Sequence, residues 1–306
     1  MQEIEQSLAE LAIGAPQVHR NLALFPLLGT EASAPGYVLL DEALRRGLAR
    51  VTEVSEGGSV PELAFENLST ERILLVDGDE LVGAKQNRIL NLSILVGPGQ
   101  RVVIPVSCVE QGRWAWRSRE FRAAGRSLFA KAKAMKMASV SASLRSHGSR
   151  RADQGEVWKF VSEKLASRGV QSATMAMADA YRSSARSLSA YARGFRARVR
   201  QRGAVVAVDG RVAGLELFDS AQAFARYLKK LVRSWALDAL ETADGRTIAP
   251  AEAEASAFLD RIRRAAAERF PALGEGEDLR LSGEGIAGGA LAVGGRVVHL
   301  AGYAVA

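Results

Sequence analysis

Hydrophobic and polar positions follow three successive patterns along the chain. Ile4, Leu8 and Leu11 recur at helical spacing and predict a short helix over residues 1–12. Short, largely apolar runs bounded by turn residues then continue as far as Trp114. They predict seven strands, at 18–25, 49–54, 60–66, 72–76, 80–84, 88–95 and 101–110. Many short strands in succession indicate an antiparallel β-sandwich or a barrel-like domain.

Turn-forming residues refine this β region. Asp77-Gly78 lies between two apolar runs and predicts a hairpin. Pro105 cannot donate a ladder hydrogen bond, so the strand at 101–110 is expected to be an edge strand or to carry a bulge. Gly83 permits a bulge or a close approach of two backbones. One helical turn is expected from Asp41, as its cap, to Gly47, where it ends.

The pattern changes again after Trp114. Residues 117–152 are basic, rich in Ser and Ala and weakly periodic, which predicts a connector with some helix. One helix is then expected to open at Asp153 or Gln154, another at Ser220, and a third to run from about 251 to 270. Hairpins are expected to turn at 209–210 and 294–295. The expected class is α+β. The expected domains are a mainly β domain at 1–116, the connector at 117–152 and an α+β domain at 153–306.

Composition indicates the cellular compartment in which the protein is expected. The single cysteine, Cys108, excludes an internal disulfide framework, and no apolar run reaches the roughly 18 residues that a membrane helix needs. The N-terminus is acidic and amphipathic, unlike a secretory signal. We therefore expect a cytoplasmic protein with no membrane association.

The net charge of +7 is concentrated in the middle of the chain, where residues 121–152 hold eight Lys or Arg and no acid. Such a segment suits an anionic partner, or it is a solvated helix surface. It lacks the interleaved aromatic and basic residues of RNA-binding modules, so a nucleic-acid partner is disfavoured.

The candidate chemistry gathers in one stretch of the β region, where Lys85, Gln86, Asn87 and Arg88 interrupt an apolar pattern. Gln and Asn offer amide donors and acceptors, and Arg offers a planar fork of donors that suits phosphate or carboxylate. These four side chains could bind a phosphate, a ribose or a base edge. They could equally tie two sheets together, because buried amides often bond to backbone carbonyls.

A second group of functional side chains ends the following strand. Glu110 could act as a general base, hold a substrate hydroxyl or pair with Arg113 or Arg88. Trp114 could stack on a base. The default for Cys108 is a small buried hydrophobe, and that for His299 on the last strand is a structural residue that could still join the site. No metal-ligand spacing and no dinucleotide fingerprint is present, so neither a metal nor another cofactor is expected.

The string GAKQNR, followed about twenty residues later by IPVSCVEQGRW, resembles the ARG and rhodanese–phosphatase-superfamily-associated protein domain family. The similarity continues through DQGEVW at 153–158, GRVAGLELFD at 210–219 and VVHL at 297–300. The positions that match the family motifs are Gly83, Lys85, Gln86, Asn87, Arg88, Cys108, Glu110, Gly112, Arg113 and Trp114. The family has no established activity. Its name records gene-neighbourhood links to ADP-ribosylglycohydrolases, which implies a role near ADP-ribose or NAD-derived metabolites.

Three hypotheses follow for the function, and the sequence leaves open whether the protein is an enzyme. In the leading one, Arg88 and Arg113 hold the phosphate of an ADP-ribose-like ligand, Gln86 and Asn87 its polar edges and Glu110 a ribose hydroxyl. In the second, the protein is a hydrolase acting on such a ligand, with Glu110 as general base and Lys85 or Arg88 stabilising developing charge. In the third, the polar block is structural and the chain is a scaffold or a homo-oligomer.

Overall fold

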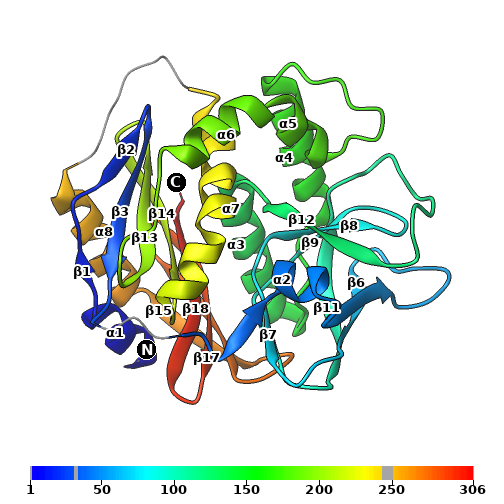
Figure 1. Ribbon diagram of the computed structural model, residues 1–306, viewed down its shortest axis with the longest axis horizontal. Coiled ribbons are helices and arrows are strands. Elements are labelled where there is room, and N and C mark those ends of the chain that lie inside the picture. Colours follow the sequence, from blue (N-terminus) through cyan, green and yellow to red (C-terminus); the bar gives the residue numbers. More distant parts are fainter. Residues whose placement is uncertain (1, 31–33, 243–250, 306) are drawn as a thin grey trace.

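A nine-stranded antiparallel sheet joins the two ends of the chain in the computed structural model, which describes residues 2–30, 34–242 and 251–305 (Figure 1). The strand order is β1-β3-β13-β14-β18-β17-β16-β15, with β2 also paired to β3. These strands are β1 (Ala12–Ile13), β2 (Gln17–His19), β3 (Leu22–Leu28), β13 (Gln201–Val208), β14 (Arg211–Phe218), β15 (Ala266–Pro271), β16 (Glu277–Gly283), β17 (Ile286–Val293) and β18 (Arg296–Ala304).

Helices cover both faces of this large sheet. One face packs against α1 (Gln2–Ala9) and α8 (Glu252–Arg264), and the other against α3 (Ala130–His147) and α7 (Ala221–Ala239). The period of two along β3 accounts for the double core, because Ala23, Phe25 and Leu27 join the α1–α8 cluster whereas Leu22 and Leu24 join the α3–α7 cluster. Around α3 and α7 pack α4 (Gln154–Ser167), α5 (Met177–Ser183) and α6 (Ala185–Arg193).

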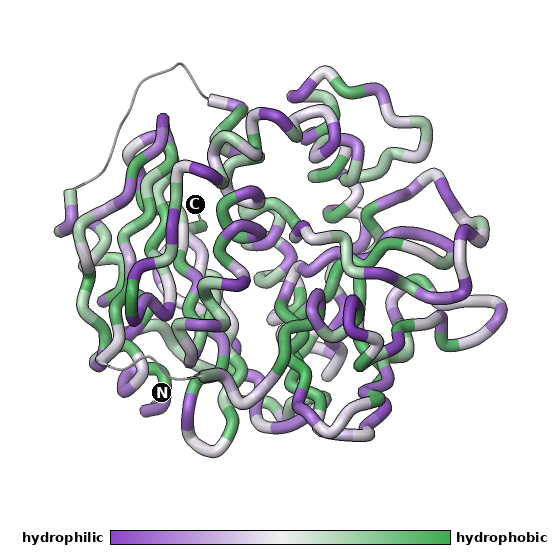
Figure 2. The backbone as a smooth tube through the Cα atoms, viewed as in Figure 1, coloured by the Kyte–Doolittle hydropathy of each residue, from purple (hydrophilic) through white to green (hydrophobic). Residues whose placement is uncertain are grey.

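The β lobe at the right of Figure 1 contains two further sheets that share one apolar core. The six-stranded sheet has the order β12-β8-β9-β11-β6-β5, and the three-stranded sheet has the order β10-β7-β4. Figure 2 shows this lobe with hydrophobic strands inside and hydrophilic loops at its outer edge. Its elements are β4 (Tyr37–Leu39), α2 (Leu40–Arg45), β5 (Ala49–Glu53), β6 (Glu62–Asn67), β7 (Arg72–Leu75), β8 (Asp79–Gly83), β9 (Arg88–Leu90), β10 (Ile94–Val96), β11 (Arg101–Cys108) and β12 (Phe121–Ser127).

The α+β class agrees with the sequence, but the segments are distributed differently from the expected domains. Strands β1, β2 and β3 lie before residue 116 and nevertheless belong to the large sheet. Residues 117–152 are not a loose connector: they form β12 and α3, and Lys133 and Lys136 of α3 are buried. These two lysines approach Glu216 and Asp77, so part of the basic run is paired inside the protein instead of solvated.

Several local expectations hold. The hairpins at 209–210 and 294–295 are present, with positive φ at both turn residues of each, as a type I′ turn requires. Asp153 and Ser220 cap α4 and α7 through their side-chain oxygens. Strand β11 lies inside its sheet, yet it pairs with β6 only up to Pro105 and with β9 only from Val106. The proline therefore sits where pairing changes from one neighbour to the other.

Three local expectations are wrong. Asp77-Gly78 does not make a hairpin, because β7 and β8 belong to different sheets and Gly78 instead exchanges backbone hydrogen bonds with Leu90 and Leu128. Asp41 does not cap α2, and its carboxylate pairs with Lys230. The helix expected to reach 270 ends at Arg264, and β15 follows it. In the part of the chain that the structure describes, no helix is both long and apolar enough to cross a membrane.

Candidate functional site

The GAKQNR segment forms the tight connection between β8 and β9. Gly83 has φ of +143°, and a Cβ at this position would lie 2.6 Å from the backbone oxygen of Glu120 and 2.7 Å from Oγ of Ser118. The next residue, Ala84, also has a positive φ, of 39°. The close backbone approach expected at Gly83 is therefore confirmed. The ladder of β8 ends at this glycine, and Lys85, Gln86 and Asn87 follow in the connection before β9 begins at Arg88.

Arg113 holds this connection in place through several hydrogen bonds. Its Nη1 donates to the backbone oxygens of Ala84 and Ala115, both at 2.8 Å. Its Nη2 donates to Oε2 of Glu110 at 2.7 Å and to Oδ1 of Asn87 at 3.2 Å. A guanidinium that satisfies this many acceptors at once fixes their relative positions, which a lysine with a single ammonium could not do.

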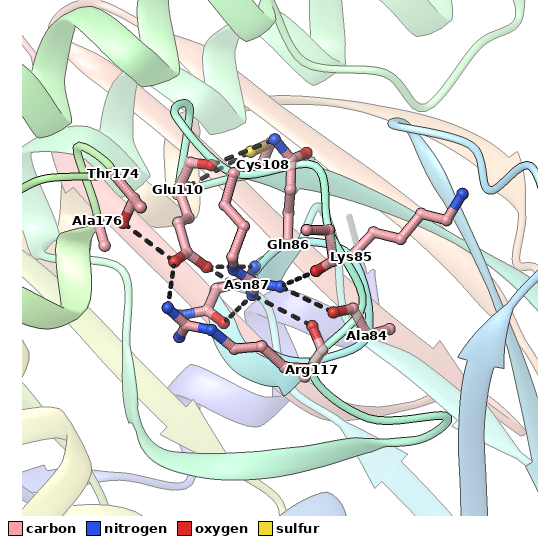
Figure 3. A network of polar contacts seen from close by, with 12 residues as sticks. Ala84, Lys85, Gln86, Asn87, Cys108, Glu110, Arg117, Thr174 and Ala176 are labelled. Atoms are coloured by element: carbon pink, nitrogen blue, oxygen red, sulfur yellow. Dashed lines mark hydrogen bonds and ion pairs between the residues drawn. The ribbon is translucent and has the colours of Figure 1, made fainter.

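Glu110 lies at the centre of the same network and is 1% exposed (Figure 3). Besides Arg113, it accepts hydrogen bonds from the Asn87 backbone N–H and from Oγ1 of Thr174, each at 3.1 Å. Burial alone would raise the pKa of this carboxyl group, but the hydrogen bond and charge of Arg113 outweigh it and hold the pKa below its ordinary value. Glu110 is thus a charged acceptor whose oxygens are already engaged.

Asn87 extends the network across the sheet. Its Nδ2 donates to Oε1 of Glu80 at 3.3 Å, and Glu80 is also paired with Arg126 of β12. Burial raises the pKa of the Glu80 carboxyl group above its ordinary value although Arg126 opposes this shift. The chain of contacts from Arg113 through Asn87 and Glu80 to Arg126 therefore spans the β8–β12 side of the sheet.

Lys85, Trp114 and Trp116 form a cover beside this network. The Lys85 ammonium donates to the Gly57 backbone oxygen at 2.6 Å and lies 5.2 Å from the ring centres of both tryptophans. Figure 3 shows the Lys85 side chain pointing away from the Glu110 carboxylate. Trp114 is 47% exposed, so part of the residue is open to solvent. Cation–π contacts at such exposed positions contribute only about 0.5–1 kcal/mol each.

Arg88 lies beneath Trp114, with its guanidinium carbon 5.6 Å from the ring centre. The residue is 0% exposed, and its Nε donates to the Val60 backbone oxygen at 3.1 Å. Its Nη1 and Nη2 have no hydrogen-bond partner among the described residues. Burial lowers the pKa of Arg88, while the nearby Cys108 and Glu53 act in the opposite direction. Arginine nevertheless stays protonated, so this is a buried cation with two unsatisfied nitrogens.

Two buried side chains nearby each have an acceptor oxygen without a hydrogen-bond donor. Glu53 accepts from the Lys85 backbone N–H through Oε1 at 3.3 Å, but its Oε2 has no partner within the described chain. Gln86 donates through Nε2 to the Glu110 backbone oxygen at 3.2 Å, and its Oε1 is likewise without a donor in that part of the protein. Arg88 thus offers two donors, and Glu53 and Gln86 offer one acceptor each.

The structure therefore divides the residues predicted from the sequence into two groups. Gln86, Asn87, Glu110 and Arg113 converge in one hydrogen-bond network, whereas Lys85, Arg88 and Trp114 form the adjoining covered group. Cys108 is buried with a raised pKa, caused chiefly by desolvation.

His299 contacts neither group. Its Nδ1 lies 2.9 Å from Oγ of Ser93 and its Nε2 lies 3.3 Å from Glu216, in a separate buried network.

Sequence reasoning missed Glu53, Glu80 and Thr174 as parts of this site. Glu53 ends β5 shortly before Gly57-Gly58, and a buried acid at a strand end next to a glycine pair is the signal that could have found it. The closeness of the glycine loop is visible at Gly58, where a Cβ would lie 3.3 Å from both Oε2 of Glu53 and the Trp114 ring. Thr174 reaches Glu110 from a loop 64 residues away in the chain, and no local pattern reports that contact.

The comparisons with known proteins agree with the motif positions. No curated protein and no solved structure matches the chain. The model of one protein family matches residues 10–303, which is nearly all of the 306 residues. That span includes both the large sheet and the β lobe with its GAKQNR connection. The chain therefore belongs to the ARG and Rhodanese-Phosphatase-superfamily-associated Protein domain family.

Proposed function

We propose that this protein binds a phosphorylated nucleotide of the ADP-ribose type at the covered group around Arg88. The observation that carries the proposal is the fully buried Arg88 guanidinium, whose Nη1 and Nη2 have no partner among the described residues. Removing one partner of a buried ion pair typically costs about 3–5 kcal/mol, since it leaves an uncompensated charge. A ligand phosphate would supply two charge-assisted hydrogen bonds and the missing negative charge.

The other unsatisfied groups favour a sugar phosphate over a simple anion. Oε2 of Glu53 and Oε1 of Gln86 both need a donor, and ribose hydroxyls or the N–H groups of a base provide donors. An inorganic phosphate dianion would satisfy Arg88 but carries a single O–H for these two acceptors. Trp114 and Trp116 offer faces on which a base can stack, an interaction that contributes about 1–3 kcal/mol per base.

Entry of the ligand requires the cover to move. The Trp114 ring makes cation–π contacts with Arg88 and Lys85, and the residue is 47% exposed. These contacts are weak compared with the charge-assisted bonds that a phosphate would form with Arg88. In this proposal Trp114 swings aside and then packs on the bound base.

The contacts of Glu110 favour a binding function over a catalytic one. Glu110, the candidate general base, already accepts from Asn87, Arg113 and Thr174 and has a lowered pKa. A general base near neutral pH works best with a pKa close to 7, which a lowered carboxyl pKa opposes. We therefore propose binding as the function and retain the hydrolase as the alternative. Within the binding proposal, Arg113 and Glu110 hold the loop, whereas Arg88 and Glu53 meet the ligand.

The direct test is isothermal titration calorimetry of the wild-type protein with ADP-ribose, NAD and adenosine. ADP-ribose and NAD are expected to give saturable heats at low salt, and adenosine, which lacks phosphate, is expected to bind at least about tenfold more weakly, a difference of roughly 1.4 kcal/mol. Equal binding of adenosine and ADP-ribose would remove the phosphate role of Arg88. No heat with any of the three, from protein with a cooperative thermal transition, would show that this group holds only ordered water.

A further inference from the structure

Three cavities meet on the outer side of β12, at Gly125. Their volumes are about 440, 270 and 710 Å³, and among the described residues Gly125 alone lines all three. Strand β12 is an edge strand of its sheet and contacts α2 and α7 (Figure 1). We call this continuous depression the β12 trough, and no residue of the Arg88 group lines it.

A β-bulge shapes the trough. The pairing of β12 with β8 passes from Ala123↔Leu81 to Ser127↔Asp79, so residues 124–126 have no counterpart in the ladder. Gly125 has φ of +65°, and a Cβ placed on it would meet nothing within 4 Å. The bulge therefore presents backbone to open space at the meeting point of the cavities. Bulges are over-represented beside functional sites, where they re-aim the chain.

Each acid that lines the 440 Å³ cavity is paired with a basic residue. Lys230 pairs with Asp41 at 2.7 Å and with Asp79 at 3.0 Å, and the Tyr227 hydroxyl donates to Asp79 at 2.9 Å. At the rim, Arg226 pairs with Glu42 at 3.2 Å. Three acids therefore face five basic residues in this cavity, and the positive excess comes from Arg45, Lys229 and Arg233.

Five other basic residues, Arg119 among them, line the trough without an acid within 4.0 Å in the described part of the chain. Arg45 and Arg122 come from the α2 and β12 sides, and Lys229 and Arg233 come from α7. No single cavity of the three is lined by all five residues, which favours an extended anion over a compact one. Cations gathered in a concave surface focus the electrostatic potential and attract anions.

We propose that the β12 trough binds a small molecule carrying a triphosphate or longer phosphate chain, at a site independent of Arg88. The 440 Å³ cavity lies within the range of about 300–1,000 Å³ that is usual for ligand sites. The phosphate chain runs along β12 past Gly125, between Arg45 on one side and Arg233 and Lys229 on the other. The adjoining 710 Å³ cavity, lined by Arg122, takes the remainder of the ligand.

Calorimetry with inorganic tripolyphosphate tests this site without a nucleotide. The wild-type protein is compared with the double variant Arg45→Gln/Arg233→Gln and with the control Arg101→Gln/Arg211→Gln, which removes the same charge from exposed arginines outside the trough. The trough variant is expected to bind at least about tenfold more weakly than the wild type, a loss of roughly 1.4 kcal/mol, whereas the control stays within about twofold. Affinity should also fall as salt is raised.

Equal losses in both double variants would overturn the proposal, because they would show attraction to the overall positive charge alone. No measurable binding of tripolyphosphate to the wild type at low salt would overturn it as well. A third variant, Arg88→Met, separates this site from the proposed function. It is expected to keep tripolyphosphate binding, and a matching loss in that variant would mean that the trough is not an independent site.

Discussion

Replacing Arg113 with alanine is expected to lower the free energy of unfolding by roughly 3–5 kcal/mol, the usual cost of removing one partner of a buried ion pair. The substitution leaves the Glu110 carboxylate buried without its strongest partner. It also strips the backbone oxygens of Ala84 and Ala115 of their donor, so the GAKQNR connection loses its clamp. Urea denaturation followed by circular dichroism measures the change.

Arg117→Ala is the matched control for this prediction. Arg117 also approaches Glu110, at 3.6 Å, but its side chain is 57% exposed. Its removal is expected to change the unfolding free energy by no more than about 1 kcal/mol. Arg113→Lys should fall between the two, because it retains the charge but not the fork of donors. If Arg113→Ala and Arg117→Ala had the same small effect, Arg113 would not organise the loop.

Replacing Arg88 with methionine is expected to weaken ADP-ribose binding by about 100-fold or more. Two hydrogen bonds to a charged group contribute about 1.5–3 kcal/mol each, and 100-fold corresponds to roughly 2.7 kcal/mol. The same change should not destabilise the protein, because a buried guanidinium with two unsatisfied nitrogens is replaced by an apolar chain of similar length. A loss of ligand affinity without a loss of stability is what we expect of a residue retained for ligand recognition.

Calorimetry and thermal denaturation of the same Arg88→Met sample measure both quantities. Adding Glu53→Gln removes the carboxylate charge that acts on Arg88, so the double variant shows the stability effect without a stranded acid. Arg101→Met, on an exposed arginine, controls for the loss of one positive charge. A large fall in thermal stability with unchanged ADP-ribose affinity would assign Arg88 a purely structural role.

Sequence patterns indicated the candidate site because its main residues are grouped in two short segments of the chain. Lys85 to Arg88 interrupt an apolar run, and Glu110 to Trp114 end the next long strand, so both groups break a local pattern. Their convergence follows from the pairing of Cys108 with Arg88 between β11 and β9. Two partners of these residues were not predicted. Glu53 ends β5, where only its position before a glycine pair marks it, and Thr174 lies in a loop where no local pattern indicates its contact with Glu110.

Hydrophobic patterns gave the least information where the interacting segments lie far apart in the sequence. Strand β3 pairs with β13, about 180 residues later, and nothing in either strand specifies that neighbour. The basic residues of 117–152 resemble a solvated connector, yet Lys133 and Lys136 find buried acids on β14 and beside β7. Charge composition alone does not distinguish a solvated lysine from one paired inside the protein, since both contribute equally to the count.

A crystal structure of the protein grown with ADP-ribose tests the central claim most directly. We expect a phosphate oxygen within about 3 Å of Nη1 and Nη2 of Arg88, a ribose hydroxyl or base N–H on Oε2 of Glu53, and Trp114 moved onto the base. Ordered water on Arg88 with Trp114 unmoved, in crystals where ADP-ribose occupies another place or none, would contradict the assignment of this buried guanidinium as the ligand site.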